Sequence, residues 1–138
     1  MFRVSRDVYD GMVRLAVDEY PLEACGLVAG PPDADGTAGD DGSAWYPCRN
    51  AAESARVYTI DPKDHLRAEL DADDHDLAIN AVVHSHTHTE AFPSPTDVAS
   101  APDPDWHYVI VSLKNETPDV KSYRIVDGEI APESFEIT

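Results

Sequence analysis

The pattern of apolar and polar positions predicts two helices in the first half of the chain. Over residues 5–20, apolar side chains recur at helical spacing, at Val8, Met12, Leu15 and Ala16. Ser5 is a suitable N-cap for this segment, and Pro21 ends it because proline has no backbone N–H to donate. A second helix is predicted to begin at Asp61, with Pro62 in its first position.

Short apolar runs bounded by glycine, proline or acidic residues predict strands along the rest of the chain. The predicted strands cover residues 22–30, 44–49, 56–60, 77–83, 106–113, 120–126 and 129–137. A short helix after Ser94 ends at residues 101–104, and Asp127-Gly128 is a turn signal between the last two strands. Together these elements predict a single α/β (α+β) domain over residues 1–138. Its mixed β-sheet has about six to eight strands flanked by about three helices.

Composition adds expectations about location and mobility. No apolar run approaches the length of a membrane span, and the N-terminal residues lack the apolar segment of a secretory signal, so we expect a cytoplasmic protein. Residues 31–43 have almost nothing to bury and predict a mobile acidic loop without chemistry of its own. Cys25 and Cys48 form neither a zinc spacing nor a disulfide framework, and the apolar run around Cys25 is typical of a small buried hydrophobe.

The charge is strongly negative. The 138 residues include 27 Asp and Glu against 10 Lys and Arg, which gives a formal net charge of -17. Such a charge argues against binding to nucleic acid or to an anionic membrane. Because self-repulsion on this scale destabilises a compact chain unless salt screens it, we hypothesise a protein adapted to a salty (halophilic) cytoplasm.

The most distinctive stretch, residues 82–97, holds a candidate metal site. His84 and His86 stand two residues apart at the end of a predicted strand, where side chains at i and i+2 leave the same face. Asp97 follows eleven residues after His86. Two imidazoles and one carboxylate make a three-ligand zinc set with one coordination position open, which is typical of a catalytic zinc.

These residues also have a purely structural interpretation. Histidines two apart on a strand are usually surface residues, and Ser94 to Asp97 has the pattern of a helix start, with Ser94 as N-cap and Pro95 in the first position. Glu23, at the start of the first predicted strand, would by itself be a solvated residue at a turn.

Two separated segments resemble one known family. His84-Ser-His86, with Ser94 and Asp97 in the order His-x-His, seven residues, Ser, two residues, Asp, resembles the signature of the JAMM (MPN) zinc metalloproteases. The segment from Leu22 to Val28 resembles the glutamate-bearing segment of that family. The order of elements also fits, and the resemblance covers nearly the whole chain. It implies an MPN/JAMM-like (cytidine-deaminase-like) fold.

The resemblance implies a role for each of five residues. His84, His86 and Asp97 would bind one Zn²⁺ per chain, with water in the fourth position. Zinc lowers the pKa of such a water from about 15.7 to near 7. Glu23 would be the general base, and Ser94 would donate a hydrogen bond to the developing oxyanion.

Further stretches resemble the small bacterial members of the family, including Thr89-Glu-Ala-Phe-Pro-Ser94 and residues 106–112 and 122–128. That resemblance implies a hydrolase that cleaves the amide bond at the C-terminal glycine of a ubiquitin-like sulfur-carrier protein and releases cysteine. The extended tail of such a carrier could add to an exposed sheet edge. A peptidase of short free peptides and a catalytically silent MPN scaffold are the alternatives; such scaffolds typically lose ligand residues.

The remaining histidines are expected to carry no chemistry. His65 is predicted on a helix surface, His75 in a solvated acidic turn at residues 71–76, and His107 in a structural role in a strand. His88 extends the His84, His86 series, so a His-x-His-x-His set could bind metal without the aspartate or hold a second ion. We expect instead that the chain turns by Thr87 and leaves His88 at the rim of the site.

Overall fold

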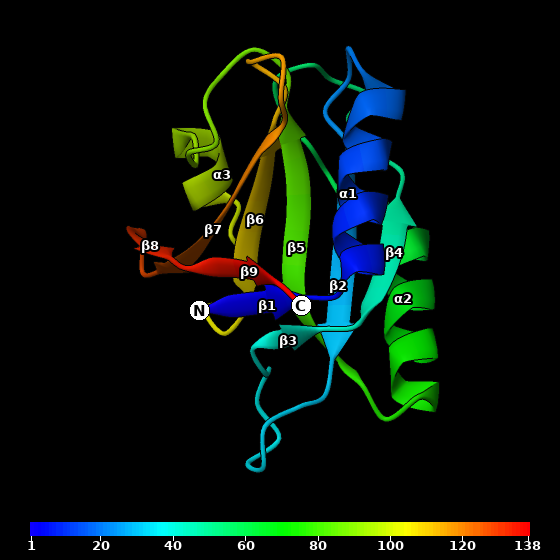
Figure 1. The fold of residues 1–138 in the computed structure, drawn as a ribbon. Helices are drawn as coiled ribbons and strands as arrows, with labels where there is room; N and C mark the ends of the chain where they lie inside the picture. Colours follow the sequence, from blue (N-terminus) through cyan, green and yellow to red (C-terminus); the bar gives the residue numbers. More distant parts are fainter.

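Six strands form one mixed sheet at the centre of the molecule (Figure 1). In spatial order they are β4 (Ala44–Cys48), β2 (Cys25–Gly30), β5 (Ala78–His86), β6 (His107–Ser112), β7 (Asp119–Val126) and β8 (Glu129–Glu133). Only the central pair β5 and β6 is parallel. The computed structural model describes all residues 1–138, and it confirms the predicted mixed sheet flanked by three helices.

A second, small sheet was not predicted. It contains β1 (Phe2–Val4), β3 (Asp41–Gly42) and β9 (Phe135–Ile137), all parallel, and it lies across the face of the large sheet that carries α1 (Figure 1). β3 lies at the end of the segment predicted as a loop, and the strand predicted over 129–137 is two strands in different sheets. Strands of two or three residues are too short to show a period in the sequence.

The three helices begin at the predicted caps. They are α1 (Arg6–Glu19), α2 (Pro62–Asp74) and α3 (Pro95–Ala99), with Ser5, Asp61 and Ser94 as N-caps. Helix α2 continues through the first part of the acidic segment 71–76, which was predicted as a turn. The reason is that Ala72, one turn after Ala68, is buried against the sheet, and His75 then caps the helix. None of the three helices has the length and apolar character needed to cross a membrane.

The predicted strand at residues 56–60 is wrong. This segment is irregular, and its single ladder contact is an isolated bridge between Ile60 and Asn50. The side chain of Asn50 also holds this segment: its amide donates to the Val57 carbonyl, and its carbonyl accepts the Thr59 N–H, both at 3.0 Å. One backbone hydrogen bond runs beside them, from the Ala51 N–H to the Thr59 carbonyl at 2.8 Å. Tyr58 and Ile60 of this segment pack against the core on the α2 side of the sheet.

The core has two layers, one on each face of the large sheet. On one face, residues of β5 and β6 pack against α1 and β1; this cluster includes Val4, Met12, Val83, Val109 and Val111. On the other face, Leu27, Val82 and Ile110 pack with the alanines of α2. Cys25 and Cys48 belong to this second layer as unpaired cysteines, and burial raises the pKa of each thiol to about 12. This confirms Cys25 as a buried apolar residue.

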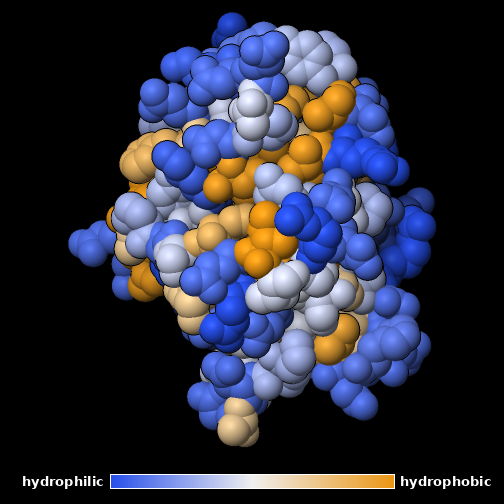
Figure 2. All heavy atoms as spheres, viewed as in Figure 1, coloured by the Kyte–Doolittle hydropathy of each residue, from blue (hydrophilic) through white to orange (hydrophobic).

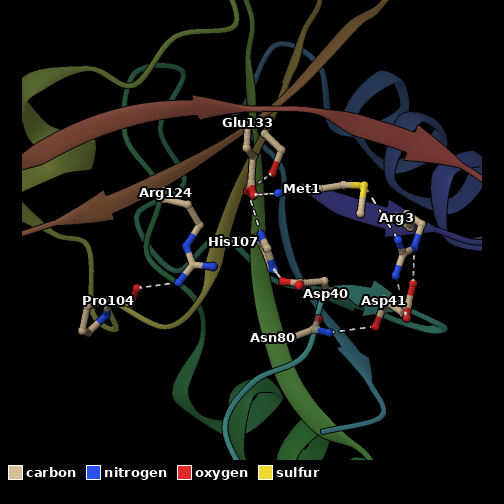
Figure 3. A network of polar contacts seen from close by, with 10 residues as sticks. Met1, Arg3, Asp40, Asp41, Asn80, Pro104, His107, Arg124 and Glu133 are labelled. Atoms are coloured by element: carbon tan, nitrogen blue, oxygen red, sulfur yellow. Dashed lines mark hydrogen bonds and ion pairs between the residues drawn. The ribbon is translucent and has the colours of Figure 1, made fainter. Parts of the chain in front are cut away.

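A polar cluster around a buried histidine, which we call the His107 network (Asp40, His107 and Glu133), joins the large sheet to the segments around β3 and β9 (Figure 3). His107 is fully buried, with Nδ1 2.7 Å from Glu133 Oε2 and Nε2 3.0 Å from Asp40 Oδ1. Its ring stacks on Phe2 at 4.3 Å. The structure thus gives His107 the structural role that was predicted.

The face of the molecule in Figure 2 is mostly hydrophilic, in keeping with the acidic composition. Figure 2 shows apolar side chains gathered mainly on the upper part of the face that carries α1, with hydrophilic residues around them.

Candidate metal centre

The C-terminal end of β5 brings two histidines to one buried place. His84 and His86 follow Val82 on the face covered by α2, because alternate residues of a strand share a face. β5 is a central strand, so His84 pairs in register with Cys25 on one side and His86 with Ser112 on the other. The two imidazoles are only 3% and 4% exposed, which excludes the interpretation as ordinary surface histidines.

The first turn of α3 supplies a carboxylate to the same place. Ser94 and Asp97 form a capping box: the Asp97 N–H donates to Ser94 Oγ at 3.1 Å, and the Ser94 N–H donates to Asp97 Oδ2 at 2.9 Å. This exchange fixes the rotamer of the buried Asp97 side chain. The predicted helix start and the candidate ligand are therefore one structure, and the two interpretations do not compete.

Three potential ligand atoms converge. His84 Nε2, His86 Nε2 and Asp97 Oδ2 lie 3.1 Å from one another in every pairing, and we call these three residues the candidate metal centre. The Nδ1 of His86 lies 2.7 Å from the Glu90 carbonyl, which accepts its proton and leaves the Nε2 lone pair directed at the other two atoms. A cation shared by the three atoms would satisfy all of them at once, so these residues fit a bound metal ion.

The electrostatics agree with this interpretation. Burial lowers the pKa of His84 and favours its neutral, metal-binding form. Burial would also lower the pKa of His86 and raise that of Asp97, but in both cases the hydrogen-bonded neighbours outweigh it. The pKa of His86 is raised by Asp97 and the Glu90 carbonyl, and that of Asp97 is lowered by the two imidazoles. The centre therefore holds an ionised carboxylate that attracts a cation.

Glu23 lies beside this centre, and its buried side-chain oxygen Oε1 makes no hydrogen bond. It comes two residues before β2 rather than within it, which corrects the predicted strand start, and only 4% of it is exposed. Its backbone is held by the Ser54 carbonyl at 2.8 Å and the Asn50 amide at 3.0 Å, while its Oε1 has no hydrogen-bond partner. Burial raises the pKa of Glu23 to about 7, with a further rise from Asp97 opposed by His86. A carboxylate with this pKa can exchange protons at neutral pH.

Two supporting groups were not foreseen. The Tyr58 ring stacks on His84 at 4.3 Å and 18° and so restricts the orientation of that imidazole. The Glu90 carbonyl does the same for His86. A backbone carbonyl leaves no signal in a sequence, and Tyr58 lies in the segment that was wrongly predicted as a strand.

His88 lies outside the candidate metal centre. β5 ends at His86, the chain bends at Thr87 as expected, and His88 is exposed with its ring edge-on to Tyr20 at 5.9 Å. The group whose ligand atoms lie within 4.8 Å of one another contains His84, His86 and Asp97, without His88.

The chain is similar to known proteins over most of its length. The model of the family Prok-JAB, prokaryotic homologs of the JAB domain, matches residues 5–126, a range that contains all five candidate site residues. The sequence is 37% identical over 135 residues to the CysO-cysteine peptidase of Mycobacterium tuberculosis, which covers 97% of this chain and 89% of that protein. It is 34% identical over 101 residues to the desampylase of Haloferax volcanii, covering 70% of this chain and 67% of that protein.

A solved structure shares the fold. The solution structure of a protein from Desulfitobacterium hafniense matches with a TM-score of 0.87 and 30% identity, covering 100% of this chain and 93% of that one. The arrangement of the sheet and helices around the candidate metal centre is therefore that of an existing structural family.

Proposed function

The chain belongs to the family of prokaryotic homologs of the JAB domain and is a hydrolase of the peptidase type, and from this premise we propose its substrate and mechanism. It hydrolyses the amide bond at the C-terminal glycine of a ubiquitin-like sulfur-carrier protein, using one Zn²⁺ held by His84, His86 and Asp97. The names of two relatives, CysO-cysteine peptidase and desampylase, support a substrate of this class.

One observation carries the proposal. Three ligand atoms converge at 3.1 Å in a buried place, next to a carboxylate whose Oε1 has no partner. Unpaired polar atoms are costly inside a protein and are retained where function uses them. Two imidazole nitrogens and one carboxylate oxygen are also a ligand set that zinc takes in catalytic sites.

Each residue then has a defined part. When bound, zinc acts as a Lewis acid that lowers the pKa of water and polarises the scissile carbonyl. Glu23 Oε1 accepts a proton from the attacking water and returns it to the nitrogen of the leaving amine. Ser94 Oγ accepts the Asp97 N–H, so its own hydroxyl proton is available to the developing oxyanion, a contact worth roughly 3 kcal/mol.

The products follow from this chemistry. Water adds to the glycine carbonyl, the carbon–nitrogen bond breaks, and the carrier leaves with a C-terminal carboxylate while the released group leaves as an amine. No observation favours the silent scaffold, because all three ligand residues and Glu23 are present and buried together.

Metal content and cleavage test the proposal together. Elemental analysis should find about one zinc per chain in the wild type, and His86→Ala and Asp97→Ala should both lose it. His88→Ala is the matched control, since it changes an exposed histidine two residues from a ligand and should retain zinc. The zinc-loaded wild type should release free cysteine from the CysO–cysteine conjugate, followed by mass spectrometry.

Two results would contradict the proposal. A wild type that fails to hold zinc even when it is supplied would remove the basis of the mechanism. Zinc retained by Asp97→Ala but lost in His88→Ala would show that the third ligand is wrongly assigned.

A further inference from the structure

A polar pocket opens beside the candidate metal centre. It has a volume of about 420 Å³, within the size range of small-molecule sites. Its lining residues include His86, His88, Glu90, Phe92, Ser94 and Lys114. The pocket therefore shares one proposed zinc ligand and the proposed oxyanion donor, and a group bound in it would lie next to the scissile bond.

Lys114 is the one lysine or arginine among the lining residues. The chain has only 10 such residues against 27 acids, and the groups around the reaction centre, Glu23 and Asp97, are carboxylates. An anionic part of a substrate would be repelled by these carboxylates, whereas Lys114 would attract it. Lys114 is therefore the lining residue that can attract an anionic part of the substrate to this pocket.

The backbone links Lys114 to the strand that carries the ligands. The preceding residue, Leu113, donates its N–H to the His86 carbonyl at 2.9 Å, and the Lys114 N–H donates to Ser112 Oγ at 3.3 Å. The base of the lysine side chain is therefore held at a defined place relative to His86, while its long chain keeps freedom to reach a ligand.

The ammonium group is only loosely paired. Lys114 Nζ lies 3.7 Å from Glu90 Oε1, beyond hydrogen-bond distance, and these side chains are 47% and 80% exposed. An exposed pair of this kind contributes little to stability, so an incoming carboxylate can displace Glu90 at low cost.

We propose that this pocket binds the α-carboxylate of the amino acid released from the carrier, with Lys114 as the cation that recognises it. The inference rests on the proposed function and specifies its leaving group: a single amino acid with a free carboxylate, rather than the lysine side chain of a protein. In such an amino acid the carboxylate is attached to the carbon next to the scissile nitrogen, so both groups can be held at neighbouring sites. Phe92, which is 51% exposed and packs edge-on to Tyr123 at 5.6 Å, offers an apolar wall to the side chain of the residue released.

Paired conjugates test this inference. The CysO–cysteine conjugate would be prepared with cysteine as the free acid and as the C-terminal amide, which lacks the negative charge that Lys114 is proposed to bind. The zinc-loaded wild type should cleave the acid with a kcat/KM about tenfold higher than the amide. Lys114→Met should lower kcat/KM for the acid about tenfold and bring the ratio close to one. Lys114→Arg, which keeps the charge, should retain most of the preference.

Lys121→Met is the matched control. Lys121 is also an exposed lysine loosely paired with a carboxylate, Asp119 at 3.8 Å, but it does not line the pocket, so this variant should keep the wild-type ratio. Equal cleavage of acid and amide by the wild type would overturn the inference and leave the proposed function intact. A loss in Lys114→Met that is equal for both conjugates would also overturn it. Failure of the zinc-loaded wild type to cleave either conjugate would overturn both proposals.

Discussion

Two buried histidine clusters occupy opposite ends and opposite faces of the central strands. The candidate metal centre lies at the C-terminal end of β5, on the face covered by α2. The His107 network lies at the start of β6, where His107 pairs with Ala81, and it faces α1 and the small sheet. Both clusters combine imidazole with carboxylate in the same sheet.

The clusters differ in how completely their polar atoms are paired. Both ring nitrogens of His107 lie against carboxylates, and Glu133 accepts hydrogen bonds from His107, from Ser122 at 2.8 Å and from the Met1 amine at 2.9 Å (Figure 3). In the candidate metal centre three potential ligand atoms face one another, and the neighbouring Glu23 Oε1 has no partner. A fully paired cluster can stabilise the fold without a ligand, whereas an underpaired one is suited to binding and proton transfer.

The largest expected effect is on activity, and it follows from replacing Glu23. Glu23→Gln should lower kcat on the CysO–cysteine conjugate by roughly 10²–10⁴-fold, because the amide cannot accept the proton of the attacking water. The variant should still bind about one zinc per chain, and thermal unfolding should show no loss of stability, since the replaced carboxylate is buried without a hydrogen bond at Oε1.

Glu133→Gln is the comparison for that experiment, since it makes the same change in the paired cluster and should leave kcat within a few-fold of the wild type. Substantial turnover by zinc-loaded Glu23→Gln would show that another group transfers the proton.

The next largest effect is the loss of stability that we expect when Glu133 of the His107 network is replaced. Glu133→Gln should lower the free energy of unfolding by about 3 kcal/mol, because it removes the buried charge that accepts hydrogen bonds from His107 Nδ1, the Ser122 hydroxyl and the Met1 amine. For a domain of this size the melting temperature should fall by about 10 °C. A change of less than about 1 kcal/mol in urea denaturation would mean that the network contributes little, and the contrast between the two clusters would then fail.

Much of the fold was predictable because its elements have local signals. The caps at Ser5, Asp61 and Ser94 begin their helices as predicted, and Asp127 and Gly128 both have the positive φ that a tight hairpin turn requires. The small sheet could not be predicted, because its strands are too short to show a period and pair residues more than 35 positions apart, such as Arg3 with Asp41.

The candidate site was predicted better than its surroundings. Local rules place His84 and His86 on one face of a strand and Asp97 in the first turn of a helix. The structure brings the three together, as the family resemblance implied. The stacking of Tyr58 on His84 and the position of Lys114 depend on where loops pack after folding, and no local pattern specifies that. Family membership and peptidase class, inferred from residues 22–28 and 82–97, are confirmed.

Added salt should change the contribution of surface charge to stability, but not the contribution of the buried His107 network. With a net charge of -17, the melting temperature of the wild type should rise by several degrees between about 0.1 M and 1 M KCl, as the Debye length falls from about 10 Å to 3 Å. The difference between the wild type and Glu133→Gln should stay constant over the same range, because buried pairs are screened much less than exposed ones. A flat or falling melting temperature would contradict adaptation to a salty environment.

The smallest expected effect is a pair of opposite pH dependences in metal-free protein. Burial alone would raise the pKa of Glu133, but its hydrogen bonds from His107, the N-terminal amine and Ser122 lower the pKa from 4.5 to about 2. The stabilisation by Glu133 is therefore present above pH 4.5 and is lost as the pH falls toward 2. Burial raises the pKa of Glu23 from 4.5 to about 7, so the folded state binds the proton more tightly, and stability is lost as the pH rises through 7. Urea denaturation of chelator-treated protein should show each slope as a change of about 1 kcal/mol after allowance for solvent screening. Glu133→Gln should reduce the acid slope, part of which remains because the pKa of Asp97 is also lowered, and Glu23→Gln should remove the neutral slope. An acid slope unchanged in Glu133→Gln, or a neutral slope unchanged in Glu23→Gln, would mean that the two glutamates do not differ as their surroundings indicate.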